Sequence, residues 1–270
     1  MQLGLIKALY TDQLTKLYSY SEAENLFYIT LQWLEKKSKT AVLLGQETLL
    51  IDTYQVVLEE LLLGKPVQYL THEAPFYGLD LYVDENVLIP RPETEQLVHW
   101  VLQDNPDFKG SVLDIGTGSG CIPLVLKSHW PKAQISGCDI SADAIAIAQQ
   151  NSNEMKLEVN FFQKDIIQED IDAYDIIISN PPYIAQSEKD QMHKNVLEHE
   201  PHIALFVDDA DPLIFYKKII QLANIQKATC YFETSEYYRE LLDSWLRESN
   251  YIFEWQLDFQ EKNRMLKVSC

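Results

Sequence analysis

Apolar residues in the first quarter of the chain recur at the spacing of helices. A capping-box pattern at residues 21–24 precedes apolar positions that follow the helical period through residues 26–34. A further helix is predicted over residues 47–63, because Gly64 follows it as a typical helix stop. Residues 1–63 therefore predict a small bundle built from helices only.

The pattern then changes to short extended segments. Residues 64–75 are predicted to be a linker, and residues 76–83 a β-hairpin in which Gly78 supplies the turn. Pro92 suits the first position of the next helix, and two glutamates follow it at the positively polarised helix N-terminus. These preferences leave Arg91 unexplained, so we hold it as a candidate site-lining residue.

From residue 111 onwards, apolar strands alternate with helices. The predicted strands cover residues 112–115, 134–138, 159–162, 175–179, 228–232, 251–255 and 264–268. Ser141 is expected to cap the helix after the second strand, which is predicted to run through Ala148 and to end at Asn151. No helix is predicted between the last two strands, so they indicate an antiparallel hairpin that edges an otherwise parallel sheet.

Composition narrows the class of protein. The 270 residues are 46% hydrophobic, which is ample for a core, and 41 acidic against 22 basic residues give a formal charge of −19. Such a surface repels phosphate backbones and counts against a direct nucleic-acid substrate. The four cysteines form no C-x-x-C pair, and no segment has the pattern of a leader or a membrane span. We therefore expect a soluble cytoplasmic protein with reduced thiols and no membrane partner.

One stretch carries the most specific chemistry. Residues 175–179 predict a buried strand that a Pro-Pro pair stops, so Asn180 falls at the strand's carboxyl end, where α/β sheets place ligands. The Asn180 amide oxygen and the Pro181 carbonyl provide two acceptors, and Tyr183 adds a flat aromatic face. A tight turn is the plain alternative, but this order of residues after a buried strand favours a grip on a planar NH₂ group.

Two neighbouring strands carry a complementary pattern. Gly116, Gly118 and Gly120 follow the first strand and precede a helix, so the backbone there can approach a ligand closely. Their G-x-G-x-G spacing differs from the dinucleotide fingerprint, which disfavours phosphate binding. Asp139 ends the next strand about twenty residues later, where an acid bonds ribose hydroxyls, and Asp165 ends the third, beside an expected adenine edge. Each acid alone is also typical of a helix cap or loop, but together they predict S-adenosylmethionine, an adenosine compound held without a phosphate clamp.

These motifs are similar to those of class I S-adenosylmethionine-dependent methyltransferases that methylate planar amino or amide nitrogen. More narrowly, the chain resembles the peptide chain release factor glutamine methyltransferases along nearly its whole length, through residues 90–95, 114–120, 179–184 and 200–205. The resemblance implies a seven-stranded Rossmann-like α/β sheet with an N-terminal helical domain and a linking β-hairpin. It divides the chain into a helical substrate-recognition domain at 1–70, a linker and hairpin at 71–91, and a methyltransferase domain at 92–270.

The same resemblance, together with the patterns above, gives each motif residue an expected role. Cofactor binding is expected from Gly116, Thr117, Gly118, Ser119, Gly120, Asp139, Asp165, Ile166 and Asn180. Substrate binding is expected from Asn180, Pro181, Pro182 and Tyr183, and catalysis from Asn180, Pro181 and Tyr183. The expected cofactor is S-adenosylmethionine, the expected partner a peptide chain release factor, and the expected product a glutamine methylated at its side-chain N5 nitrogen.

Three alternatives to this function stay open. An adenine-N6 DNA methyltransferase shares the Asn-Pro-Pro-Tyr motif, although the acidic composition disfavours it. A ribosomal-protein glutamine methyltransferase would use the same chemistry. A non-catalytic cofactor-binding scaffold would have no need of Asn180 and Tyr183.

Two segments depart from the family pattern, and one cluster of histidines gives no metal signal. The family usually has glycines where residues 206–212 stand, and often Glu-x-Gly where Glu233 begins Glu-Thr-Ser. His193, His199 and His202 lie near one another in sequence but lack the spacing of a zinc-binding motif, so no metal is expected.

Overall fold

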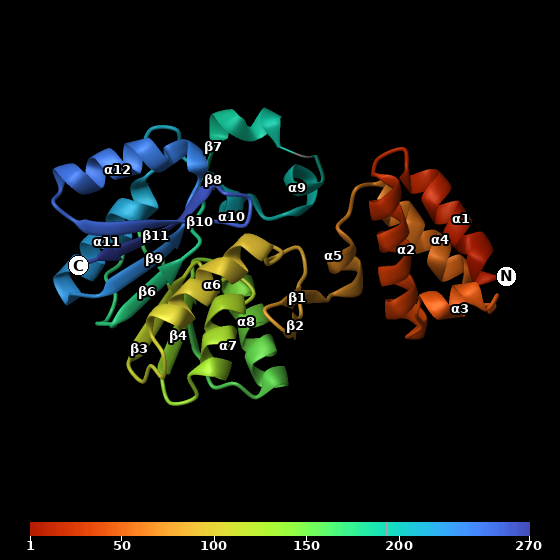
Figure 1. The fold of residues 1–270 in the computed structure, drawn as a ribbon, viewed down its shortest axis with the longest axis horizontal. Coiled ribbons are helices and arrows are strands. Elements are labelled where there is room, and N and C mark those ends of the chain that lie inside the picture. The colour runs from red at the N-terminus through yellow and green to blue at the C-terminus, as the bar shows by residue number, and fades with distance from the viewer. Residues whose placement is uncertain (193) are drawn as a thin grey trace. The chain divides into compact units, whose positions relative to one another are not determined.

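The computed structural model describes residues 1–192 and 194–270, and the chain divides into two compact units (Figure 1). The first unit combines residues 1–73 with residues 194–199, and the second combines residues 74–192 with residues 200–270. The linking hairpin therefore clusters with the second unit. Residues 194–199, which connect the two parts of the second unit, form a short helix that belongs to the first unit.

The first unit is a helical bundle. It contains α1 (Leu3–Leu14), α2 (Tyr20–Glu35), α3 (Lys39–Leu43), α4 (Ile51–Leu62), α5 (Val67–Thr71) and α9 (Lys194–His199). Its core centres on three buried aromatic residues, of which Tyr10 and Phe27 meet edge to face with ring centroids 5.5 Å apart. Tyr10 also donates a 2.6 Å hydrogen bond to the Tyr54 carbonyl, so its hydroxyl is satisfied inside the core. The predicted bundle is confirmed.

The structure corrects both predicted helix starts in this unit. Ser19 and not Ser21 caps α2, since its hydroxyl accepts from Glu22 N at 3.2 Å and its backbone is extended. The sequence holds Ser-x-x-Glu twice, two residues apart, so the pattern alone could not choose between them. The helix predicted from residue 47 begins at Ile51, because the Thr48 hydroxyl turns the chain by accepting from Leu50 N at 3.0 Å.

The predicted linker is also not free of regular structure. Residues 67–71 form α5, which ends where His72 adopts a left-handed conformation. Beyond it lie β1 (Ala74–Phe76) and β2 (Leu79–Leu81), paired antiparallel as the predicted hairpin. Tyr77 and Gly78 both have positive φ, 48° and 84°, which is the conformation that a two-residue hairpin turn requires. The hairpin and the role of its glycine are confirmed.

The second unit is built on a central sheet. Among the described residues, seven strands form it in the order β10-β11-β9-β6-β3-β4-β5. They are β3 (Ser111–Ile115), β4 (Gln134–Asp139), β5 (Asn160–Gln163), β6 (Ile176–Ser179), β9 (Thr229–Glu233), β10 (Ile252–Leu257) and β11 (Asn263–Ser269). The strands from β9 to β5 run parallel, and β10 and β11 add an antiparallel hairpin at one edge, as predicted.

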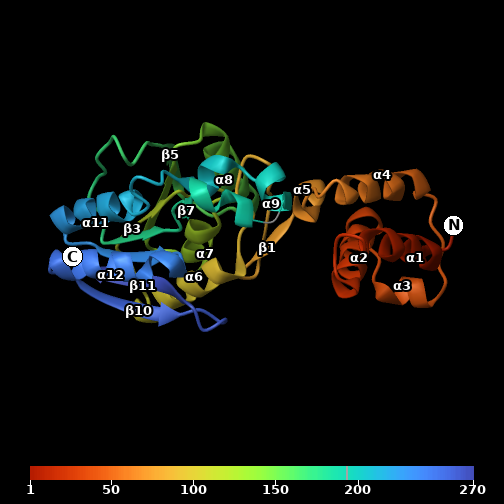
Figure 2. The same cartoon turned by 90° about the horizontal axis from the view of Figure 1, so that it is seen from above.

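Helices cover both faces of this sheet (Figure 1; Figure 2). On one face pack α6 (Pro92–Asp104) and α7 (Cys121–His129), and on the other α11 (Ile214–Gln226) and α12 (Arg239–Glu248). The side chains of β6 alternate between the two cores: Ile176 and Ile178 join the first and Ile177 the second. This two-sided burial explains why the strand is apolar at consecutive positions.

Helix α8 (Ala142–Met155) corrects a further prediction. Ser141 caps it as expected, with Ala144 N donating to the hydroxyl at 3.2 Å, but the helix continues past Asn151 to Met155. Asn151 is fully buried; its oxygen accepts from Tyr82 N at 2.7 Å, and its NH₂ donates to the Tyr82 and Ser119 carbonyls. These tertiary partners, invisible in the local pattern, satisfy the amide inside a helix.

Shorter elements complete the chain. They are β7 (Ile184–Ala185), the 3₁₀ turn η1 (Gln186–Gln191), α10 (His202–Leu205), β8 (Phe206–Val207) and the 3₁₀ turn η2 (Glu236–Tyr238). Strands β7 and β8 pair parallel to each other. Across the described ranges, none of the helices combines the length and apolar character that crossing a membrane would need.

Candidate functional site

The glycine turn after β3 and the Asn180 turn after β6 lie side by side in the second unit. β3 and β6 are parallel neighbours, with Ile115 opposite Ser179 in the pairing. The Ser179 hydroxyl donates to the Ile115 carbonyl at 2.7 Å and ties the two strand ends together. On one side of this pair the sheet continues to β4 and on the other to β9, so the strand order reverses here. Open α/β sheets bind ligands at such a switch point.

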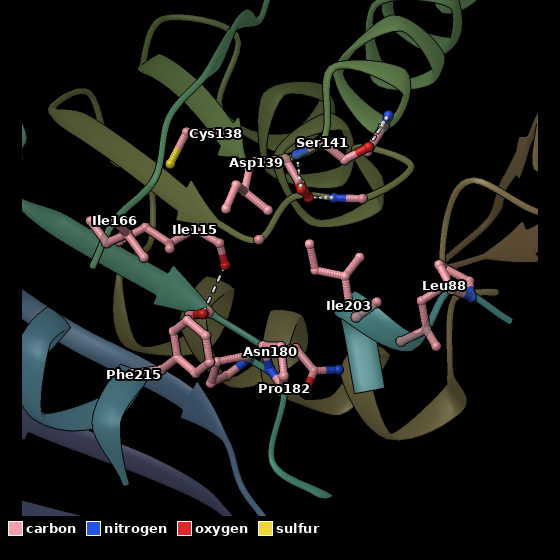
Figure 3. A pocket seen from close by; sticks show the side chains of 18 of the residues that line it. Leu88, Ile115, Cys138, Asp139, Ser141, Ile166, Asn180, Pro182, Ile203 and Phe215 are labelled. Atoms are coloured by element: carbon pink, nitrogen blue, oxygen red, sulfur yellow. Dashed lines mark hydrogen bonds between the residues drawn. The ribbon is translucent and has the colours of Figure 1, made fainter. Parts of the chain in front are cut away.

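A cavity of about 370 Å³ opens at this point (Figure 3). Its size is in the range typical of small-molecule sites. The predicted site residues that line it are Gly116, Gly118, Asp139, Asp165, Ile166, Asn180, Pro181 and Pro182. Figure 3 shows Asp139 and Asn180 on opposite sides of the cavity, with Ile203 between them in this view. Thr117, Ser119, Gly120 and Tyr183 do not line it.

The three glycines have different roles although all have positive φ, at 75°, 52° and 80°. A Cβ atom added to Gly116 or Gly118 would meet nothing within 4 Å, because both face open space. A Cβ on Gly120 would come within 3.0 Å of the Phe161 ring and 3.1 Å of Ala148. Gly120 therefore serves packing against α8 and β5, and the first two glycines leave room for a ligand.

Asp139 holds the glycine turn in place. One carboxylate oxygen accepts from Gly118 N at 2.9 Å and the other from Ser141 N at 3.0 Å. Burial raises the pKa of this carboxyl, and the backbone donors Ser141, Gly118 and Ile140 oppose the shift. Each oxygen keeps acceptor capacity beyond its present bond, so Asp139 can still take ribose hydroxyls.

Asp165 is both a turn residue and a residue of the cavity wall, the two roles that its sequence context allowed. Its carboxylate accepts from Ile167 N at 2.9 Å, which is a turn-stabilising bond, and the residue also lines the cavity beside Ile166. Ile166 is buried. Together they form a partly apolar wall with a carboxylate edge, which suits an adenine ring and its amino group.

The Asn-Pro-Pro-Tyr turn faces two hollows. Asn180, Pro181 and Pro182 line the main cavity, whereas Tyr183 lines a second pocket of about 240 Å³ with residues that include Arg264. The Asn180 NH₂ donates to the Thr94 hydroxyl at 3.2 Å, and the Tyr183 hydroxyl donates to a Glu233 carboxylate oxygen at 3.5 Å. Burial raises the pKa of Tyr183, so its hydroxyl keeps its proton.

Asp114 is a candidate site residue to which the sequence reasoning gave no role of its own. It lies beneath the glycine turn with 1% of its surface exposed, and neither carboxylate oxygen has a hydrogen-bond partner in residues 1–192 or 194–270. Burial raises its pKa to about 7, opposed by the nearby Thr117 hydroxyl. The hydroxyls of Thr117 and Ser119 are likewise buried without a bond in these ranges. The sequence feature that could have identified Asp114 is its place at the end of a buried strand, two positions before Gly116.

These features fit S-adenosylmethionine. Asp139 suits the ribose and Asp165 suits the adenine. Asp114 does not line the cavity, but its buried, unpaired carboxyl lies directly before the lining residues Ile115 and Gly116, where negative charge suits a positively charged amino or sulfonium group. Gly116 and Gly118 leave space where side chains would otherwise fill the cavity. Apolar residues such as Phe215 supply most of the remaining wall.

Arg91 acts on the edge of the site without lining it. Its guanidinium pairs with Glu200 at 2.5 Å, and the Glu200 side chain is 2% exposed. The other Glu200 oxygen is buried with no hydrogen bond in the described part of the chain. Since Pro201 lines the cavity directly after Glu200, this ion pair fixes one wall of the cavity.

No metal centre stands beside this cavity in the described residues. Within them, no three His, Cys, Asp or Glu side chains are arranged to hold a metal ion. Of the histidines noted in the sequence, His193 lies outside the described residues. His199 contacts the Leu63 carbonyl at 3.3 Å within the helical unit.

Comparison with known proteins shows which proteins the chain resembles. Residues 93–203 match the family model described as the methyltransferase small domain. A protein of Flavobacterium psychrophilum named release factor glutamine methyltransferase is 39% identical over 278 residues, which cover 96% of each chain. A Bacteroides thetaiotaomicron protein of the same name is 43% identical over 188 residues, covering 67% of each chain.

A solved structure supports the fold. The crystal structure of the hMettl16 catalytic domain in complex with MAT2A 3′UTR hairpin 6 matches with a TM-score of 0.57 and 18% identity. The match covers 72% of this chain and 76% of that chain. Together with the methyltransferase family model and the seven-stranded, mostly parallel sheet, it confirms the Rossmann-like class I methyltransferase fold predicted from the sequence.

Proposed function

The chain belongs to the release factor glutamine methyltransferase family, and on that premise we propose that it methylates the side-chain N5 nitrogen of a glutamine in peptide chain release factors. The observation that carries this proposal is the shared cavity. Asn180 and Pro181, which can grip an amide, line the same cavity as Gly116 and Asp139, which can hold the cofactor. The proposed sites for the methyl donor and for the methyl-accepting glutamine therefore adjoin.

S-adenosylmethionine, when bound, supplies a methyl group on a positively charged sulfur that is already a strong electrophile. We assign Asp139 to the ribose, and Asp165 with Ile166 to the adenine. The buried Asp114 carboxylate complements the positive charge of the methionine end. Gly116 and Gly118 let the backbone approach closely.

The protein's main task is to make the glutamine nitrogen available. An amide nitrogen is a weak nucleophile because its lone pair is delocalised into the carbonyl. We propose that its two N–H groups donate to the Asn180 side-chain oxygen and the Pro181 carbonyl, which draws the nitrogen towards tetrahedral geometry. Alignment of this kind can contribute roughly 7–11 kcal/mol in favourable cases.

Tyr183 holds the amide plane in this proposal. Its hydroxyl is fixed by Glu233, so the ring offers a flat surface at a set angle. Transfer would form the N–CH₃ bond as the S–CH₃ bond breaks, with that electron pair staying on the departing sulfur. The nitrogen is then cationic and loses a proton to water. The Asn180 and Pro181 oxygens are acceptors that bind the cationic nitrogen more strongly than the neutral amide, which favours the transition state.

We assign recognition of the release factor to the helical domain, residues 1–70. Large apolar side chains stand exposed on it, among them Leu43 at 85%, Leu44 at 71% and Leu49 at 97%. Exposed apolar groups gathered on one short segment are typical of protein-binding surfaces. Residues 71–91 would serve as linker and hairpin, and residues 92–270 as the methyltransferase domain.

The chemistry favours a protein substrate in the cytoplasm over nucleic acid. A formal charge of −19 opposes binding of a phosphate backbone, and an adenine methyltransferase needs such binding. The described cysteines are free thiols, in keeping with a reducing compartment. A ribosomal-protein glutamine offers the same amide and is the second candidate substrate.

The test is methyl transfer from labelled S-adenosylmethionine to separate samples of release factor, ribosomal proteins and DNA. We expect label on release factor alone, with peptide mass mapping placing it on a glutamine side chain. The matched control is the Asn180→Ala enzyme, which should bind cofactor but label release factor about 10²–10³-fold more slowly. Label on DNA or on ribosomal protein in place of release factor would overturn the assignment.

A further inference from the structure

We propose that Thr94 and Glu233 are positioning residues that set which end of the Asn180 amide faces the glutamine. The inference rests on the proposed function, because it concerns the same amide grip. Thr94 lies in the first turn of α6 and Glu233 at the end of β9. Neither touches the proposed substrate nitrogen in this scheme. Both act through Asn180.

The hydroxyl hydrogen of Thr94 decides which end of the Asn180 amide this hydroxyl can meet. Thr94 has one hydroxyl hydrogen, and its oxygen lies 2.6 Å from a Glu233 carboxylate oxygen. An ionised carboxylate only accepts hydrogen bonds, so the hydroxyl hydrogen must point to Glu233. The Thr94 oxygen is then left as an acceptor. Asn180 therefore has to present its NH₂ group there, at the observed 3.2 Å.

This chain of bonds leaves the amide oxygen of Asn180 at the other end. The donors and acceptors around Asn180 decide which end of its amide carries the oxygen. A flipped amide would set its oxygen against the Thr94 oxygen, acceptor to acceptor. It would also point NH₂ at the glutamine NH₂, donor to donor. Only the observed orientation provides the acceptor that the transfer needs.

Glu233 is held firmly enough to impose this orientation. Its side chain is buried, with the residue 2% exposed, and the Tyr216 hydroxyl donates to its backbone carbonyl at 3.2 Å. Its second carboxylate oxygen accepts from Tyr183 at 3.5 Å. One carboxylate thus orients both side chains that flank the proposed acceptor nitrogen.

This assignment accounts for residues that the cofactor and amide motifs leave unexplained. Thr94 lies in the Pro-Arg-Pro-Glu-Thr-Glu stretch, where helix capping explains the prolines and glutamates but not the threonine. Glu233 begins the Glu-Thr-Ser stretch that departs from the family pattern in its third residue. The departure leaves the carboxylate itself unchanged.

The test is single-turnover methylation of release factor with saturating cofactor and substrate, once the wild-type enzyme has been shown to methylate it. Thr94→Val removes the hydroxyl at nearly constant volume, and we expect the rate to fall by about 10²-fold through loss of alignment. Thr94→Ser keeps the hydroxyl and should stay near the wild-type rate. The cofactor dissociation constant should be unchanged in both variants.

A double-mutant cycle separates positioning from general structure. If Thr94 acts through Asn180, Thr94→Val should lower the rate in the wild-type background and cause no further loss in the Asn180→Ala background. Equal losses in both backgrounds, or a wild-type rate for Thr94→Val, would overturn the proposal. Failure of the proposed function is distinct, because the wild-type enzyme would then leave release factor unmethylated.

Glu233→Gln gives a second route should Thr94→Val fail to fold. Glutamine can offer Thr94 either an oxygen or an NH₂ group, so the Asn180 orientation is no longer dictated. We expect a several-fold lower rate that again disappears in the Asn180→Ala background. An undiminished rate for a folded Glu233→Gln enzyme would contradict the role of the carboxylate.

Discussion

Two adjacent turns form the site, and they are built in opposite ways. In the glycine turn after β3, Gly116 N and Thr117 N donate to the Cys138 carbonyl at 2.9 and 3.0 Å. Gly118 N donates to Asp139, so these partners lie at the end of the neighbouring strand β4. In the turn after β6, the Asn180 side chain is instead held by Thr94, 86 positions away in the chain.

The difference separates two kinds of function. The glycine turn offers backbone atoms and empty space. Its function therefore depends on the absence of side chains at the glycines. The asparagine turn offers one side chain whose orientation matters, and orientation comes from partners elsewhere in the fold. Substitutions in the first turn should therefore change cofactor binding or stability, whereas those in the second should change the rate of methyl transfer.

The largest expected effect comes from Asn180→Ala. The variant removes the side-chain acceptor but keeps Pro181 and Tyr183. Because the lost bond strengthens as the nitrogen becomes cationic, turnover should fall by about 10²–10³-fold, by analogy with losing one preorganised hydrogen-bonding group. Single-turnover rates at saturating substrate and cofactor measure this, with a cofactor titration alongside.

Asn180→Asp is the matched control for that variant. A carboxylate keeps the acceptor facing the glutamine but has no NH₂ to donate to Thr94, so we expect partial activity. If Asn180→Ala transferred methyl at the wild-type rate, the asparagine would be a turn residue and the proposed grip would be wrong.

The next effect in size belongs to Asp139→Ala and should appear in binding. Loss of charge-assisted hydrogen bonds to the ribose should cost about 1.5–3 kcal/mol of cofactor affinity. The Gly118 N–H also loses its acceptor, which loosens the glycine turn. Calorimetric titration with S-adenosylmethionine measures the change, and an unchanged affinity would remove Asp139 from the cofactor site.

The same contrast between local and distant partners explains which parts of the fold and site could be predicted from the sequence. The antiparallel edge hairpin, the glycine turn and the position of Asp139 were predictable because their signals lie within single strands and the turns that follow them. The link from Thr94 to Glu233 spans 139 positions and becomes visible only when α6 and β9 pack together. Asn151 was misjudged for the same reason, since its partners Tyr82 and Ser119 are distant in sequence.

A pair of glycine variants sharpens the comparison within the first turn. Gly116→Ala and Gly120→Ala place alanine at similar positive φ, 75° and 80°, so both carry backbone strain. Only the second also meets Phe161 at 3.0 Å. We expect Gly120→Ala to lose about 1–3 kcal/mol more stability through overpacking. Gly116→Ala should mainly weaken cofactor binding.

Denaturant unfolding and cofactor titration of both glycine variants give the measurement. Gly120→Ala should show the larger loss of stability, and Gly116→Ala the larger loss of cofactor affinity. Equal stability losses for the two variants would mean that the contacts of Gly120 have no energetic weight.

The smallest expected effect is a pH dependence that has opposite signs for rate and stability. The groups that act on the Glu233 carboxyl are Thr94, Glu93, Arg264 and Tyr183. Burial raises its pKa from 4.5 to about 7, the Thr94 hydrogen bond lowers it, Glu93 raises it and Arg264 lowers it. Glu233 therefore gains its charge near neutral pH.

The ionised carboxylate is the form that orders Thr94 and Asn180, so the rate should rise with pH and level off above about 7. Between pH 6 and 8 the rate should rise several-fold and at most about tenfold, which is the change in the ionised fraction. Stability should change the other way: the folded state holds a proton that the unfolded state has lost, so the free energy of unfolding falls as pH rises from 4.5 towards about 7. Glu233→Gln should flatten the rate profile at saturating cofactor. A profile that keeps its rise in this variant would assign the titration to another group.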